Sequence, residues 1–288
     1  MACQLQYLRH CLRQRIRRAL DELPDTLNKT YDRTLEEIGK QNWEYAHRLF
    51  QCVAAAARPL RVEELAEFLA FDFDADSIPT LREDWREEDP AHAVRFTCSS
   101  LLAIVDVDGS SVIQFSHFSV KEYLTSKRLS ESKETISQFH VSMTPAHTSI
   151  AQACLGVLLQ IDENVTKDDL EKFPLASYAA KHWAGHARFE GVSPNIEDGM
   201  KHLFDPNNHH FSIWVRIYRP ERPMGIHSIY ERLPHIRATP LHYAGWHGLY
   251  EVVKFLIIER SQNVNAQGFR RQETLLSVAS RQGYSEVA

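Results

Sequence analysis

The stretch from Ser100 to Ser126 reads SLLAIVDVDGSSVIQFSHFSVKEYLTS. Its first part contains two apolar runs on either side of Asp108-Gly109, a dipeptide that suits a tight β-turn with positive φ angles. The pattern therefore predicts a β-hairpin. His117 follows the second run directly and marks the change from strand to helix pattern.

The second part of this stretch predicts a helix. Ser119 and Glu122 have the spacing of a capping box, and Phe118 and Tyr123 occupy the positions of a hydrophobic staple. We therefore expect the helix to begin at Ser119. These signals leave His117 unexplained.

Upstream, the sequence predicts a helix-turn-helix. Apolar residues at helical spacing indicate one helix over residues 43–57 and a shorter one over residues 62–69, with Pro59 at the turn. The acidic segment over residues 72–95 is expected to be irregular. Helices followed by a hairpin are in the order of a winged helix, which we place at residues 43–130.

The flanking segments are predicted to be helical. Residues 1–42 form an N-terminal helical segment, in which Arg9, Arg13 and Arg17 line one face and are balanced by nearby acids. A helical domain is expected over residues 131–235, with prolines, asparagines and histidines making 190–237 irregular. No run approaches the roughly 20 apolar residues of a membrane span, so no membrane partner is expected.

Residues 236–288 contain an internal repeat. The segments ATPLHYAGWHGLYEVV and ETLLSVASRQGYSEVA align at a separation of 35 residues, and TPLHxA at such a period is the ankyrin signature. In the first copy a threonine caps the helix, proline stands at its first position and glycine ends it; the motif residues are Thr239, Pro240, Leu241, His242, Ala244 and Gly248. The second copy ends mid-repeat, and we expect a truncated product.

The sequence lacks recognisable catalytic motifs. It has no GxxxxGK[ST], GxGxxG, GxSxG or HExxH pattern, so we expect no enzyme, no bound cofactor and no catalytic residue. Five cysteines, without CxxC pairs or an apolar N-terminal leader, predict a reducing, cytoplasmic setting.

Two possible metal sites and a possible nucleic-acid site each have a simpler interpretation. Asp72, Asp74, Asp76 and Glu83 have calcium-loop spacing, but the required glycine is absent. His182 and His186 could share a metal in a hydrolase, although packing with hydrogen-bonded imidazoles is the simpler expectation. A winged helix could bind DNA, yet residues 58–101 hold five arginines, no lysine and eleven acids, which disfavours phosphate contact.

Five segments in this order resemble a known family: LPDTLNKTYDRTLEEI, ARPLRVEELAEFLAFD, CSSLL, FSHFSVKEYLTS and FPLASYAAKHWAGHA, followed by ankyrin repeats. The set is similar to the region downstream of the ATPase in fungal NACHT-ankyrin proteins, which are NLR-like STAND signalling proteins. The resemblance covers nearly the whole chain. It implies a non-catalytic regulatory and protein-interaction fragment, with a NACHT domain and ankyrin-bound proteins as partners.

The resemblance also implies a role for His117. NACHT proteins have a motif similar to FSHFSVKEYL whose histidine contacts the phosphates of bound ADP, and His117 occupies that place. ADP or ATP would then be bound only by an upstream NACHT domain. The alternative is a packed histidine bonded to backbone. We expect a mainly α protein made of a winged helix with a small hairpin, a helical domain and an incomplete ankyrin stack. A nucleic-acid regulator and a metal-dependent hydrolase are the competing functions.

Overall fold

The computed structural model describes residues 27–74, 78–220, 238–269 and 271–287. They form two compact units, the first of residues 27–70 and 85–146, and the second of residues 71–84 and 147–287 with the gaps just given. Residues 1–26 of the expected N-terminal helical segment, with Arg9, Arg13 and Arg17, lie outside the described residues.

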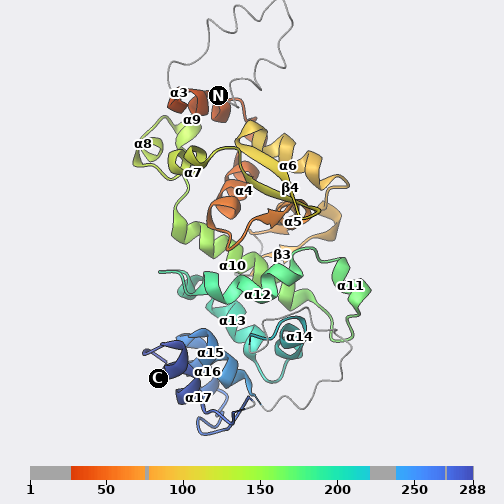
Figure 1. Ribbon diagram of the computed structural model, residues 1–288, viewed down its shortest axis with the longest axis vertical. Helices are drawn as coiled ribbons and strands as arrows, with labels where there is room; N and C mark the ends of the chain where they lie inside the picture. Colours follow the sequence, from red (N-terminus) through yellow and green to blue (C-terminus); the bar gives the residue numbers. More distant parts are fainter. Residues whose placement is uncertain (1–26, 75–77, 221–237, 270, 288) are drawn as a thin grey trace, which may run out of the picture. The chain divides into compact units, whose positions relative to one another are not determined.

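At the centre of the first unit, helices α4, α5 and α6 accompany a three-stranded antiparallel sheet (Figure 1). In chain order these are α4 (Trp43–Ala55), β1 (Leu60–Arg61), α5 (Val62–Glu67), α6 (Pro90–Cys98), β4 (Leu102–Val107) and β5 (Ser110–Phe115). The sheet order is β1-β5-β4, so the first short strand pairs with the last strand of the hairpin. This order of elements is that of a winged helix, and the predicted fold class is confirmed.

The predicted hairpin is confirmed at its turn. Val107 pairs with Ser110, and the two residues between them, Asp108 and Gly109, have φ angles of 51° and 76°. Positive φ at both central residues matches the right-handed twist of the flanking strands. The side chain of Asp106 accepts a hydrogen bond from the Gly109 N–H at 3.1 Å, which further fixes the turn.

The expectation of irregular structure over residues 72–95 is wrong at both ends. Helix α6 begins at Pro90, and the side chain of Asp89 accepts a hydrogen bond from the His92 N–H at 3.0 Å. An aspartate cap followed by proline at the first helical position is a helix-start signal, and the surrounding acids obscured it. At the other end, β2 (Phe71–Asp72) pairs with β3 (Thr80–Leu81) in the second unit.

The helix after the hairpin begins differently from the prediction. Helix α7 spans Phe118–Leu124 and is capped by His117, whereas Ser119 lies within its first turn. Phe118 is 71% exposed and therefore forms no staple with the buried Tyr123. Further short helices of this unit are α3 (Leu27–Glu36), α8 (Lys127–Ser130) and α9 (Glu134–Ser137).

The second unit is built mainly from helices: α10 (Met143–Gln160), α11 (Lys167–Glu171), α12 (Ala176–Ala187), α13 (Glu197–Phe204) and α14 (His210–Ile217). Helix α10 runs across the unit boundary and contributes most of its residues here. The irregular structure expected over residues 190–237 is corrected by α13 and α14. Both helices bury apolar side chains, namely Met200, Leu203 and Phe204 on α13 and Ile213 and Trp214 on α14. This burial stabilises both helices despite the helix-breaking residues between them.

The ankyrin segment forms α15 (Pro240–His247), α16 (Tyr250–Ile258) and α17 (Leu275–Gln282) in the same unit. Trp214 of α14 connects this segment to the preceding helices. Its indole N–H donates to the Ala180 carbonyl at 2.8 Å, and its ring lies 5.8 Å from Tyr243 and 5.6 Å from Trp183 between centroids. One aromatic core is therefore shared by the helices and the first ankyrin helix.

Candidate functional site

His117 lies at the junction between β5 and α7 in the first unit. Its Nδ1 accepts a hydrogen bond from the Ser119 N–H at 3.3 Å and lies 2.6 Å from the Ser119 hydroxyl. The side chain is exposed, with its ring 4.2 Å from that of Phe118. The alternative was a packed histidine bonded to the backbone. His117 is not packed, but it does have the expected hydrogen bond to a backbone N–H.

The Ser119 hydroxyl is also bonded to helix α3. It lies 2.8 Å from the phenol oxygen of Tyr31, which is 1% exposed. Tyr31, Ser119 and His117 thus form one continuous chain of hydrogen-bonding groups that begins in the core and ends at the surface.

Helix α3 is held beside this chain by a charged cluster. Arg128 donates to both oxygens of Asp32, at 3.0 and 2.6 Å, and the Tyr123 hydroxyl donates to Asp32 at 2.6 Å. Burial opposes ionisation of Asp32, but the hydrogen bonds from Arg128 and Tyr123 outweigh it and lower the pKa of the carboxyl. Because the aspartate stays ionised, α3 is fixed against α7 and α8.

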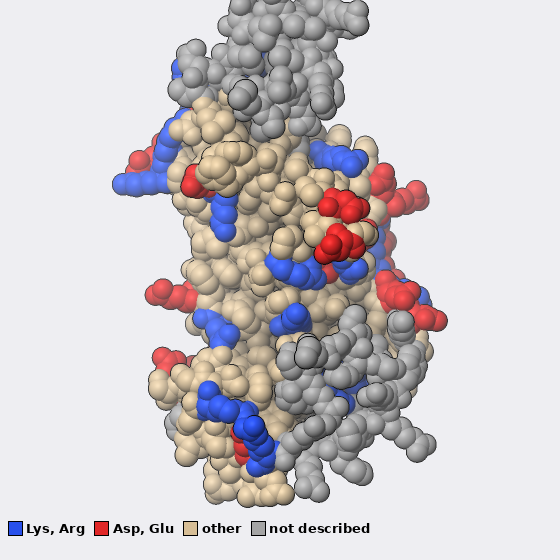
Figure 2. Space-filling model, viewed as in Figure 1, with Lys and Arg blue, Asp and Glu red and all other residues tan. Residues whose placement is uncertain are grey.

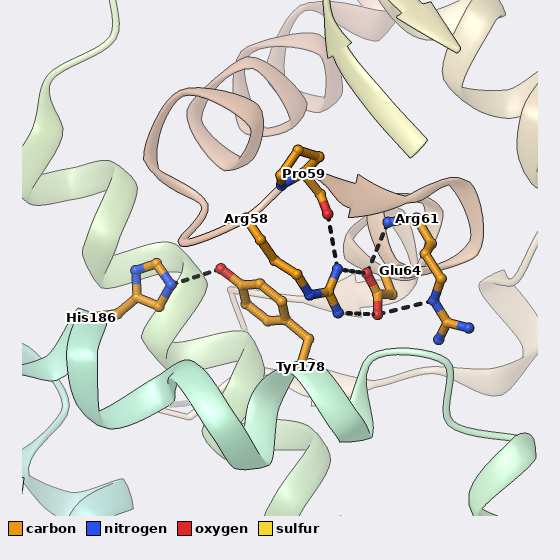
Figure 3. A network of polar contacts seen from close by, with 6 residues as sticks. All are labelled: Arg58, Pro59, Arg61, Glu64, Tyr178 and His186. Atoms are coloured by element: carbon orange, nitrogen blue, oxygen red, sulfur yellow. Dashed lines mark hydrogen bonds and ion pairs between the residues drawn. The ribbon is translucent and has the colours of Figure 1, made fainter. Parts of the chain in front are cut away.

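Another anchor in this unit is Glu64, near the start of α5 (Figure 3). Its carboxylate is buried, accepts two hydrogen bonds from Arg58 at 2.7 Å each, and accepts the Arg61 N–H at 2.8 Å. Burial raises its pKa, but the arginine and backbone donors outweigh burial, so the pKa of Glu64 is lowered. The group therefore stabilises the connection between α4 and α5, where β1 separates the two helices that the sequence predicted as a helix-turn-helix.

Helix α6 corresponds to the helix that enters the major groove in DNA-binding winged helices. Arg95 is its one charged residue, and Phe96 is 66% exposed with its ring stacked on His92 at 5.9 Å. On the face in Figure 2, basic and acidic side chains are scattered and do not gather into one basic patch among the coloured residues. Arg95 is thus the one Lys or Arg that α6 offers to a phosphate, whereas duplex binding draws on several such contacts.

His186, in the second unit, lies in a buried polar group. Its Nδ1 is 2.8 Å from Nδ1 of His147 on α10, and its Nε2 is 2.8 Å from the Tyr178 hydroxyl (Figure 3). Burial, together with His147 and His182, lowers the pKa of His186 to about 3. A hydrogen-bonded, packed imidazole, the simpler expectation for His186, is therefore observed.

Metal ligation has no structural support in the described part of the chain. No group of three or more His, Cys, Asp or Glu side chains there is arranged to hold a metal ion. Asp72 of the supposed calcium loop lies in β2 and accepts a hydrogen bond from the Asp74 N–H at 3.1 Å, while Asp76 lies outside the described residues. Likewise, no helix in the described ranges is long and apolar enough to span a membrane.

The ankyrin motif residues have the local roles that their types imply. Thr239 precedes α15, Pro240 is its first residue, and Gly248 ends it with φ of 66°. His242 is buried and accepts through Nδ1 from the Thr239 N–H at 3.2 Å, while Nε2 lies 2.9 Å from both the Ala266 and Glu273 carbonyl oxygens. Because Nδ1 meets an N–H group, the ring proton is on Nε2, and His242 ties the first repeat to the second. The remaining motif residues, Leu241 and Ala244, are buried.

Several of these residues were not found from the sequence. Tyr31 contacts Ser119 across 88 positions, Tyr123 contacts Asp32 across 91, and His147 contacts His186 across 39. No local pattern pairs residues at such distances. The start of α6 is different, because Asp89 followed by Pro90 is a helix-start signal that can be recognised from neighbouring residues.

Comparison with known proteins agrees with the two recognisable parts of this fold. Residues 31–141 match the family model described as the winged helix domain of GPI inositol-deacylase, and residues 237–269 match the ankyrin repeat model. A curated fungal protein, "Azaphilone pigments biosynthesis cluster protein L" of Monascus ruber, is 28% identical over 277 residues, covering 91% of this chain and 58% of that protein. The chain thus spans less than two thirds of that relative's length. No solved structure matches the chain. Residues 31–141 and 237–269 are thus similar to a winged helix domain of the GPI inositol-deacylase type and to an ankyrin repeat.

Proposed function

We propose that this chain is a non-catalytic regulatory and protein-interaction portion of an NLR-like, NACHT-ankyrin signalling protein that acts in the cytoplasm. The observation that carries the proposal is the order of the parts in one chain: a winged helix over residues 31–141, then helices, then an ankyrin repeat at 237–269. The relative is longer than this chain, which leaves room for an ATPase domain in proteins of this type.

In the proposed mechanism, the winged helix contacts a nucleotide-bound NACHT domain through His117. The imidazole is exposed, and its capping bond uses Nδ1. The opposite ring nitrogen, Nε2, is then available as a donor to a phosphate oxygen. The ankyrin repeats would bind protein partners. The effect of this binding would reach the helical domain through the shared aromatic core around Trp214.

The test uses a NACHT domain encoded upstream of residue 1. If the reading frame there contains a GxxxxGK[ST] loop, the longer protein is loaded with fluorescent ADP and the release rate is measured. We expect His117→Gln to speed ADP release by roughly ten- to a hundredfold, as for loss of a hydrogen bond to a charged group. His92→Gln, an exposed histidine on α6, is the matched control and should leave release unchanged.

Equal ADP release by the wild type and His117→Gln would remove the nucleotide role of His117. An upstream frame without a phosphate-binding loop would count against the whole proposal. A DNA-binding regulator, the competing function, requires duplex affinity with a steep salt dependence, and the acidic, apolar surroundings of α6 favour no such affinity.

A further inference from the structure

We propose that Tyr31 is a positioning residue, which acts through Ser119 to hold His117 in the tautomer that presents Nε2–H to the surface. The functional meaning of this inference rests on the proposed contact between His117 and a phosphate. The hydrogen-bond geometry that supports it is independent of that contact.

The first step concerns the proton on His117. A backbone N–H can only donate, and the Ser119 N–H points at Nδ1 from 3.3 Å. Nδ1 therefore carries a lone pair, because two N–H groups facing each other would repel. In a neutral imidazole the proton must then be on Nε2, which leaves an N–H donor directed away from the helix.

The second step concerns the direction of the hydroxyls. The Ser119 oxygen lies 2.6 Å from Nδ1, so its O–H must donate to that lone pair. The same oxygen can then only accept from the Tyr31 O–H, which lies 2.8 Å away. The chain thus runs in one direction, from Tyr31 through Ser119 to His117, and each bond strengthens the next.

The third step concerns what holds Tyr31 in place. The Tyr31 side chain is 1% exposed, with its ring 5.2 Å from that of Tyr123. Its neighbour Asp32 is bonded to Arg128 and Tyr123, at distances of 2.6–3.0 Å. The docking of α3 therefore fixes the start of the chain, and a displacement of α3 would release the His117 ring.

The experiment measures the tautomer directly in the full chain. Histidines are labelled with ¹⁵N, the two ring nitrogens of His117 are assigned by comparison with His117→Gln, and their shifts are recorded in mildly alkaline buffer. We expect the wild type to have its proton on Nε2. Tyr31→Phe should raise the ratio of Nδ1–H to Nε2–H by roughly two- to tenfold, the effect of one hydrogen bond.

The matched control is Tyr123→Phe. It removes a hydroxyl that donates to Asp32 and is outside the chain, while Arg128 keeps both of its bonds to Asp32 and so keeps α3 docked. The His117 tautomer ratio should therefore not change. Ser119→Ala should act like Tyr31→Phe, whereas Ser119→Thr keeps the hydroxyl and should restore the wild-type ratio. Unchanged signals from the other histidines establish that each variant is folded.

A Tyr31→Phe ratio equal to that of the wild type would overturn the inference, and so would equal changes in Tyr31→Phe and Tyr123→Phe. The outcome is separate from the ADP experiment. A tautomer shift in Tyr31→Phe, with ADP release unaffected by His117→Gln, would keep the positioning role and remove the proposed nucleotide contact.

Discussion

Mild acid is expected to destabilise the second unit because two of its histidines are buried without a compensating negative charge. The pKa of His186 is lowered to about 3 by burial and by His147 and His182. The pKa of His247 is likewise lowered to about 3, by burial and by Arg188. In the unfolded chain both return to about 6.5.

The direction in which the free energy of unfolding changes with pH follows from proton binding. Between pH 6.5 and 3 the unfolded chain binds more protons at these two sites than the folded chain, so the free energy of unfolding falls as pH falls. At pH 5, 1.5 pH units below the unfolded value, each histidine costs about 2 kcal/mol. The two together cost about 4 kcal/mol, a large part of a typical stability of about 5–15 kcal/mol.

The paired carboxylates should contribute little to the change in the free energy of unfolding between pH 7 and pH 5. Paired acids such as Asp32 and Glu64 have pKa values below their ordinary range, so their contribution is lost only below pH 5. The stability lost between pH 7 and pH 5 should therefore come from the histidines.

The assay is urea denaturation at pH 7, 6 and 5, followed by tryptophan fluorescence, to which the buried Trp183 and Trp214 of the second unit contribute. His247→Gln removes one proton site and should reduce the loss between pH 7 and pH 5 by about 2 kcal/mol. His92→Gln, on an exposed face of α6, should have the wild-type pH dependence. Equal stability of the wild type at pH 5 and pH 7, or the same slope in His247→Gln, would refute the reasoning.

Three further changes test individual contacts by the free energy of unfolding. Glu64→Gln should destabilise the first unit by about 1–3 kcal/mol, because it weakens the charge-assisted hydrogen bonds that the buried carboxylate accepts from Arg58 and Arg61, whereas the exposed Glu63→Gln on the same helix should cost under about 0.5 kcal/mol. Gly156→Ala should cost about 1–3 kcal/mol, since the added Cβ would lie 2.4 Å from a carbonyl oxygen; Gly185→Ala meets no atom within 4 Å and should be neutral or stabilising. His242→Ala should cost about 2–4 kcal/mol through lost ties between the two repeats, measured by the same urea titration, and an effect under 0.5 kcal/mol would contradict the linking role.

The parts of the fold that the sequence predicted are those specified by neighbouring residues. Asp108-Gly109 specifies the hairpin turn because its two φ angles are positive, and the TPLHxA segment specifies a capped helix with a buried histidine. Both patterns act within a few residues. The turn and the helix start that they specify can therefore be read from a few neighbouring residues.

The start of α7 was predicted incorrectly for a reason that is not local. Ser119 has the type and spacing of a cap, but its hydroxyl is engaged by Tyr31, which is 88 residues away. The imidazole of His117 supplies the capping acceptor in its place. An imidazole can do this because its unprotonated nitrogen is an acceptor, although capping preferences based on Ser, Thr, Asp and Asn do not consider it.

The side chains of α6 decide between two uses of the winged helix. DNA-binding members of this architecture require basic residues near the third helix, but here Glu87, Glu88 and Asp89 precede α6 and Phe96 is 66% exposed on it. Covering the rest of that phenyl ring with a protein surface would contribute about 1–2 kcal/mol, whereas phosphates offer it nothing and would be repelled by the three acids. The same fold that presents a helix to a DNA groove therefore presents here a face suited to protein contact, which supports the interaction proposal over the nucleic-acid alternative.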